Sequence, residues 1–184
     1  PPSEPHHRHA SEPLLSKHPH TAHVPRAPGH TTPFPQYGIP STVMADGPVG
    51  VRIFPIKVDG KRHYCSCFPS STLLASTWDT QLVVTQAGAM GEEAAVYDVD
   101  VILTPGINIM RNPLCGRNFE YFSEDPVLSG LMGAAMVNGV QSRGIGTSLK
   151  HFVANHQQVI KLNNDCRRPV KALRYIYVKG FEIS

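Results

Sequence analysis

Long apolar runs are missing from this sequence. No segment approaches the roughly 20 consecutive apolar residues that a helix needs to cross a bilayer, and the N-terminal stretch has no apolar core of the signal-peptide type. The sequence therefore predicts no membrane partner. The compartment stays open, and a secreted or extracytoplasmic location is compatible with a chain that does not begin with methionine.

An excess of charge of one sign is also missing. Lysine and arginine number 17 and aspartate and glutamate 14, which gives a formal net charge of +3. The basic residues are scattered rather than gathered into a stripe, so a nucleic-acid partner is not expected. With 41% hydrophobic and 17% charged residues, the composition is that of an ordinary globular protein.

Cysteine is scarce, and its spacing matches no zinc motif. The four cysteines are Cys65, Cys67, Cys115 and Cys166. The first two form a lone C-x-C pair, which is weak support for metal or redox chemistry, and free or incidentally paired thiols are the simpler interpretation. A glycine-rich phosphate loop is absent as well. We therefore expect neither a metal nor a cofactor.

Residues 1–34 differ from the rest of the chain. They hold many prolines and little apolar content, so they cannot bury enough surface to offset the entropy of ordering, and a disordered tail is predicted. Histidine-rich tracts can bind metal, but these histidines follow no fixed spacing. A metal-binding module is thus a weak hypothesis. The tail's histidines are His6, His7, His9, His18, His20, His23 and His30.

Three short apolar segments predict buried strands. They cover residues 41–45, 100–104 and 144–149, and the first two end at the turn signals Asp46-Gly47-Pro48 and Pro105-Gly106. Strands that are apolar on both faces are typical of a parallel sheet covered by helices. Three β/α units are therefore expected within residues 35–184.

Helical spacing follows each strand. One helix is expected from Ser70 or Ser71, with Leu74, Trp78 and Leu82 recurring on one side. A second begins at Pro126 with Asp125 as its N-cap. Leu128, Leu131, Met132, Ala135 and Met136 should form its buried face. A third begins near Pro169, with Val170, Leu173, Tyr177 and Phe181 on the buried side.

The alternation of strands and helices predicts an α/β fold, namely part of a (β/α)₈ TIM-type barrel. A complete barrel takes about 250 residues, so about 150 ordered residues supply about three units. In such barrels the active site lies at the carboxyl ends of the strands. Asp46, Lys150 and His151 fall at or just after predicted strand ends, and Arg117 lies in the long loop after the second strand.

These four residues suit an array of sugar hydroxyls. A carboxylate such as Asp46 accepts hydroxyl protons, while lysine and arginine donate to hydroxyl oxygens. Each residue also has a simpler interpretation. Asp46 can shape a turn. Arg117 can pair with Glu120 or Glu124 as a structural clip, and Lys150 with His151 can form a solvated strand end.

Several motifs resemble glycoside hydrolase family 3, most closely its β-glucosidase branch, from residue 35 to the C-terminus. The resemblance implies an N-terminal (β/α)₈-type barrel and a following α/β sandwich domain, retaining hydrolysis of β-linked glycosides by two carboxylates, and no cofactor. The motifs are Met44-Ala-Asp-Gly-Pro-Val-Gly-Val-Arg52, Phe68-Pro-Ser-Ser, Ala75-Ser-Thr-Trp-Asp79, Leu103-Thr-Pro-Gly-Ile-Asn-Ile109, the run from Asn112 to Pro126, and Lys150-His-Phe-Val-Ala-Asn-His-Gln157.

The resemblance also implies roles for single residues. Asp46, Arg117, Lys150 and His151 match residues that hold the sugar in the −1 subsite, and Arg52 matches an arginine that lines the same pocket. Lys161 stands where members often carry an arginine, eleven residues after the lysine. Lysine keeps the charge there but loses the bidentate fork.

Two departures from the family pattern concern catalysis and the last helix. The family's nucleophile lies in a Ser-Asp-Trp type motif, and its acid/base in the second domain, so both are expected beyond residue 184. In the last helix, Val170 and Tyr175 replace glutamates.

Val153-Ala-Asn155 differs from the signature of another branch of the family, the N-acetylglucosaminidases, which argues against a catalytic His–Asp dyad.

The sequence thus predicts a fragment of a retaining β-glucosidase that acts in carbohydrate metabolism on terminal β-D-glucosyl residues. It would carry part of the −1 subsite and neither catalytic carboxylate. The partner would be a β-glucoside or oligosaccharide, and the oligomeric state is not predicted. The alternative is a non-catalytic pseudoenzyme or sugar-binding remnant, which the changes at Lys161, Val170 and Tyr175 motivate.

Overall fold

The structure is a computed structural model that describes residues 29–53, 56–58, 60–158, 163 and 165–184. Its elements run in the order β1 (Gly29–His30), η1 (Pro35–Tyr37), β2 (Val43–Asp46), β3 (Ile56–Val58), β4 (Lys61–His63), α1 (Ser71–Ala75), α2 (Thr80–Val96), β5 (Val101–Leu103), η2 (Asn118–Glu120), α3 (Pro126–Gln141), β6 (Gly146–Thr147), α4 (Val170–Ala172), η4 (Leu173–Tyr177) and α5 (Lys179–Ile183). No helix among these residues is long and apolar enough to cross a membrane.

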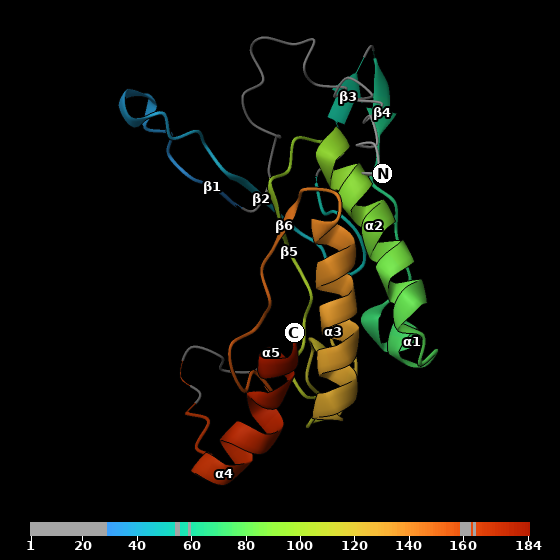
Figure 1. Cartoon of the computed structure of the whole chain (residues 1–184), viewed down its shortest axis with the longest axis vertical. Coiled ribbons are helices and arrows are strands. Elements are labelled where there is room, and N and C mark those ends of the chain that lie inside the picture. Colours follow the sequence, from blue (N-terminus) through green and yellow to red (C-terminus); the bar gives the residue numbers. More distant parts are fainter. Residues whose placement is uncertain (1–28, 54–55, 59, 159–162, 164) are drawn as a thin grey trace, which may run out of the picture.

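The central sheet has the strand order β1-β2-β5-β6. β2, β5 and β6 are mutually parallel, with Ala45 beside Ile102 and Ile102 beside Thr147. Each of these three strands leads into helices, which confirms the predicted β/α units and the partial TIM-type barrel. β3 and β4 form a separate two-stranded antiparallel sheet (Figure 1).

The ordered part begins earlier than the sequence predicts. Gly29 and His30 form β1 and pair antiparallel with Met44 and Val43 of β2, so residues 29–34 do not belong to a disordered tail. Backbone hydrogen bonds to β2 hold Gly29 and His30 in place, and amino-acid composition does not indicate such pairing. Residues 1–28, with the other histidines of the predicted metal module, lie outside the described part of the chain.

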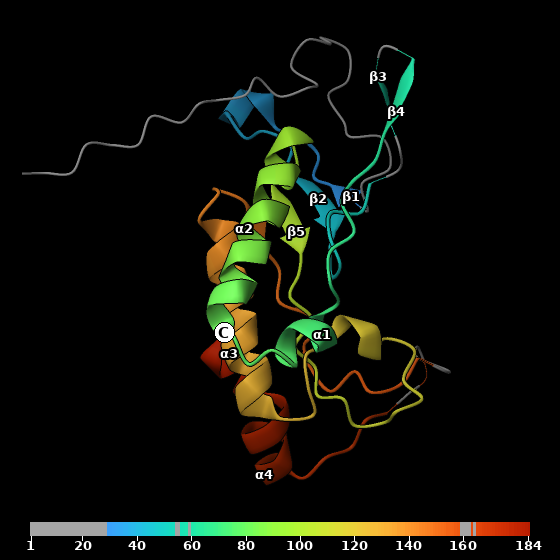
Figure 2. The same cartoon turned by 90° about the vertical axis from the view of Figure 1, so that its right-hand side faces the viewer.

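The helices α2 and α3 lie side by side along one face of the sheet (Figure 1 and Figure 2). The main core lies between these helices and the strands, where Ala45, Ile102, Val83 and Met136 are all fully buried. Burial of these apolar side chains is the main force that fixes the helices over the sheet. The carboxyl ends of the parallel strands are thereby held in fixed positions relative to one another.

The predicted helix through Leu74, Trp78 and Leu82 is divided in two. α1 ends at Ala75, Trp78 has a positive φ of 57° and is 76% exposed, and α2 begins at Thr80. Asp79 explains the break, because its side chain accepts a hydrogen bond from the backbone N–H of Leu82 at 3.0 Å and caps the second helix. The continuous apolar spacing was therefore misleading at this point.

For the other two predicted helices, the start was predicted correctly, but one residue in each was wrongly expected to be buried. Asp125 caps α3 by accepting from the Leu128 N–H at 2.7 Å, and the last helical segment begins directly after Pro169. Leu131 of α3 and Val170 of α4 are exposed, although both were predicted to be buried. Spacing alone does not tell how wide a covered stripe is.

Small residues let α2 and α3 approach closely. A Cβ atom added at Gly139 would lie 2.5 Å from both the Ala87 Cβ and the Val84 carbonyl oxygen. At Gly88, on the facing helix, the nearest atoms belong to the flexible Arg143 side chain at 3.4 Å. The two glycines therefore differ in whether the contact tolerates a methyl group.

We expect Gly139→Ala to lower the free energy of unfolding by about 1–3 kcal/mol, because the backbone of α2 cannot move aside without separating the helices. Gly88→Ala is the matched control, since Arg143 can shift and alanine favours a helix by up to about 1 kcal/mol. Urea unfolding of both variants tests this, and equal stabilities would contradict the close contact.

Candidate functional site

The carboxyl ends of the parallel strands gather the polar loops of the chain. β2 ends at Asp46, and Lys150 follows β6 by three residues. Isolated bridges join Gly106, after β5, to both Tyr121 and Lys150. The loops that follow all three strands therefore meet at one edge of the sheet, as expected for a β/α barrel.

Lys150 is the centre of an ion-pair cluster at this edge. Its Nζ lies 2.5 Å from Asp46 Oδ1 and 3.2 Å from Glu120 Oε2. Arg117 completes the cluster, because its Nε donates to Glu120 Oε1. The side chain of Lys150 is only 12% exposed and that of Glu120 only 3%. Buried charges persist only when they are paired, so the cluster is a mutually dependent unit.

Glu120 is the main residue that the sequence interpretation did not assign to the site. It was considered only as one end of a clip with Arg117, and that pairing is present. Its position between Phe119 and Tyr121 was the available signal, because a carboxylate inside an aromatic run needs buried partners. Burial alone would lower the pKa of Arg117, but the hydrogen bond and charge of Glu120 outweigh it and raise that pKa.

Arg52 lies at the outer side of the cluster. Its Nη1 is 3.9 Å from Asp46 Oδ2, its side chain is 77% exposed, and its backbone N–H donates to the carbonyl of Asp46 at 2.7 Å. The backbone contact places Arg52 beside the cluster without burying its charge. Lys161, the sixth predicted site residue, lies outside the described residues.

His151 belongs to a second hydrogen-bonded group next to the cluster. Asn155 Nδ2 donates to the Tyr121 hydroxyl at 3.2 Å, and that hydroxyl lies 3.0 Å from His151 Nδ1. When the hydroxyl donates to Nδ1, the imidazole hydrogen sits on Nε2. The backbone N–H of His151 donates to Asn108 Oδ1 at 2.5 Å. Burial raises the pKa of Tyr121, so this hydroxyl keeps its proton.

The cluster opens into a cavity of about 620 Å³, a size typical of small-molecule sites. Charged and apolar side chains share its walls, and its polar floor is formed by Asp46, Arg117 and Glu120, whereas Lys150 and His151 do not line it. The lining residues are Asp46, Pro48, Val49, Gly50, Val51, Arg52, Ile53, Tyr64, Cys65, Ser66, Cys67, Arg117, Phe119 and Glu120.

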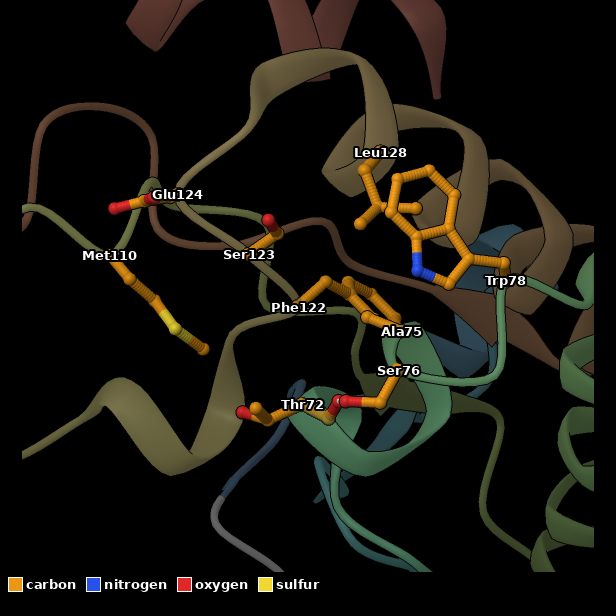
Figure 3. A pocket seen from close by; sticks show the side chains of 9 residues that line it. All are labelled: Thr72, Ala75, Ser76, Trp78, Met110, Phe122, Ser123, Glu124 and Leu128. Atoms are coloured by element: carbon orange, nitrogen blue, oxygen red, sulfur yellow. The ribbon is translucent and has the colours of Figure 1, made fainter.

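A second hollow of about 320 Å³ lies around α1 and the start of α3 (Figure 3). Trp78, Phe122 and Leu128 line it together with Ser123 and Glu124. The carboxylate of Glu124 points away from the Trp78 ring in this view. None of the predicted site residues lines this hollow, so the cavity beside Asp46 is the better candidate.

Metal ligation finds no support within the described part of the chain, which contains no cluster of three or more potential His, Cys, Asp or Glu ligands. The four cysteines, all within the described part of the chain, form no disulfide with one another. Cys115 is buried and acts as a packing residue. Burial, with the nearby charge of Glu93, raises the pKa of Cys65 to about 11, so this thiol stays protonated at neutral pH.

His156 is a buried titratable group behind the site. Its Nδ1 lies 3.2 Å from the carbonyl oxygen of Ile109, and its ring packs on Tyr177 with centroids 4.8 Å apart. Burial lowers its pKa, and the charges of Arg168 and Arg111 add to this effect. The folded chain therefore holds His156 neutral where the unfolded chain would protonate it.

His156 should make the fold acid-sensitive below its unfolded pKa of 6.5. As the pH falls through this value the unfolded state takes up a proton first, so stability present above pH 6.5 is progressively lost. His156→Asn keeps a donor for Ile109 and cannot titrate. Its unfolding free energy should fall less between pH 7 and pH 5 than that of the wild type, and parallel profiles would contradict the assignment.

Comparison with known proteins agrees with this geometry. Residues 40–182 match the glycosyl hydrolase family 3 N terminal domain. Thermostable beta-glucosidase B of Acetivibrio thermocellus is 46% identical over 83% of this chain, which corresponds to 21% of that protein. An exo-alpha-(1->6)-L-arabinopyranosidase of Bifidobacterium longum is 47% identical over 79% of the chain and 20% of its own length.

The fold is shared with solved structures as well. Beta-glucosidase 3B from Thermotoga neapolitana, solved in complex with glucose, superimposes with a TM-score of 0.78 at 50% identity. The match covers 87% of this chain and 22% of that one, so the chain spans about a fifth of the length of these relatives. The resemblance drawn from the motifs is thus confirmed, and the chain belongs to glycoside hydrolase family 3.

Proposed function

We propose that this chain supplies much of the −1 sugar subsite of a retaining β-glucosidase that hydrolyses terminal β-D-glucosyl residues. The observation that carries the proposal is the partly buried cluster of Asp46, Lys150, Glu120 and Arg117 at the strand-end edge of the barrel. Asp46, Glu120 and Arg117 line the cavity and give it both acceptors and donors, as a ring of sugar hydroxyls requires.

Each proposed contact follows from the chemistry of the side chain. Asp46 lines the cavity, and its Oδ2, which the exposed Arg52 approaches only to 3.9 Å, is the oxygen proposed to accept from sugar hydroxyls. Arg117 lines the cavity and donates to hydroxyl oxygens. Lys150 and His151 do not line it, and they are included because the family motif implies sugar contacts for both. Arg52, which lines the cavity, and Lys161, which lies outside the described residues, complete the proposed set.

The described carboxylates of the cluster are suited to binding rather than to attack. Asp46 and Glu120 both pair with Lys150, and such pairing stabilises the carboxylate charge that a nucleophile must give up. Retaining hydrolysis needs a nucleophile and an acid/base about 5–5.5 Å apart. We therefore assign both roles to residues outside this chain, in a protein comparable in length to the relatives.

Glucose is the favoured sugar because the solved glucosidase that binds glucose shares 50% identity with this chain. The relative named for L-arabinopyranosides shows that this domain type also serves another glycone. The alternative of a non-catalytic remnant was motivated partly by Val170 and Tyr175. Both are exposed and neither lines the cavity, so these changes leave the proposed subsite intact.

Asp46→Asn should weaken glucose binding by the purified chain about tenfold or more, because hydrogen bonds to a charged acceptor contribute about 1.5–3 kcal/mol each. Asp165→Asn is the control, since it makes the same chemical change in an exposed ion pair with Arg167. Titration followed by NMR or calorimetry measures both. Equal affinities for the two variants would remove Asp46 from the subsite.

The purified chain should release no aryl alcohol from an aryl β-glucoside above the rate in buffer, since differential stabilisation of the transition state needs both catalytic carboxylates. The assay is best run with the glucose-binding chain and with its Asp46→Asn variant. Turnover that depends on Asp46 would assign catalysis to the cluster itself and overturn this division of roles.

A further inference from the structure

We infer that Glu120 is a specificity-determining residue: its buried negative charge neutralises the cavity floor and so selects uncharged sugars over sugar acids and sugar phosphates. This inference rests on the proposed sugar binding and adds to it a class of excluded ligand. Glu120 lines the cavity, yet its side chain is only 3% exposed. It therefore acts mainly through its charge and through the cations that it holds.

The charges of the ion-pair cluster balance. Asp46 and Glu120 contribute two negative charges, and Lys150 and Arg117 contribute two positive charges, all from side chains that are no more than 24% exposed. Lys150 does not line the cavity itself but pairs with two residues that do. Arg52 adds a fifth charge, but it is largely exposed, so solvent and salt screen it. With Glu120 replaced by a neutral group, two poorly solvated cations would face one carboxylate.

The contacts of Glu120 point to an electrostatic role. Oε1 accepts from Arg117, and Oε2 lies 3.2 Å from the Lys150 ammonium, so each oxygen is paired with a cation. In a place so poorly exposed to solvent, the carboxylate contributes chiefly through its charge. Glu120 thus saturates the cations that would otherwise be available to an anionic ligand.

This arrangement treats neutral and anionic sugars differently. A hydroxyl can bind beside a paired cation without displacing its carboxylate. A ligand carboxylate or phosphate must compete with Glu120 and Asp46, and like charges held close together cost affinity. If Glu120 served only to hold Arg117 in place, removing its charge would change the affinities for neutral and anionic sugars by the same factor. The ratio of the two affinities therefore distinguishes a structural role of Glu120 from an electrostatic one.

The test measures glucose and glucuronate binding to the wild type and to Glu120→Gln, which keeps the size of the side chain and removes its charge. We expect the ratio of the two affinities to move toward glucuronate by about tenfold, and the shift to shrink at high salt. Glu92→Gln is the control, because it makes the same change in a surface pair with Arg143, and its ratio should match the wild type.

Two further measurements keep the outcome decisive. Glu120→Asp retains the charge and should retain the preference for glucose even if both affinities fall. If Glu120→Gln does not fold, the wild type alone decides, because comparable affinities for glucose and glucuronate would overturn the inference. An unchanged ratio in a folded Glu120→Gln would also overturn it, whereas a wild type that binds neither sugar would instead reject the proposed function.

Discussion

The structure depends on one largely buried ammonium that is shared by two carboxylates. Lys150 follows β6, Asp46 ends β2 and Glu120 lies in η2, so the ion pairs join three loops that are far apart in sequence. Loss of one partner would leave an uncompensated charge in a poorly solvated place, which is far more costly than loss of an exposed pair. The same contacts that hold the loops together therefore also define the polar floor of the cavity.

The sheet that carries this cluster was largely predictable. Apolar segments bounded by turn residues indicate buried parallel strands, and parallel strands bring their carboxyl ends to one edge, so the sequence alone predicts that Asp46, Lys150 and His151 lie near one another. The break at Trp78 was not predictable from spacing, because the capping side chain of Asp79 interrupts a pattern that otherwise continues. The pairing of Gly29–His30 depends on a long-range edge contact.

The supporting residues of the site were the least predictable part. The local pair of Glu120 with Arg117 could be anticipated, but Glu120, Tyr121, Asn108 and Asn155 each also bind a partner that lies about 30 residues or more away in the chain, and no local motif reveals these contacts. Local sequence patterns identify side chains suited to binding sugars. The residues that hold those side chains in place are identified only from the hydrogen bonds that buried polar groups make in the structure. Tyr121 illustrates this, because its hydroxyl lies 3.0 Å from His151 Nδ1 and accepts from Asn155, so it links two residues of the loop after β6.

The cysteines around the cavity have a practical consequence. Cys67 is exposed on the cavity wall, Cys65 stays protonated because burial raises its pKa to about 11, and Cys115 is buried. A thiol-directed fluorophore should therefore couple at Cys67 in preference to these two neighbours. Its emission would then report occupancy of the cavity, so the natural sequence already carries an attachment point for a ligand sensor.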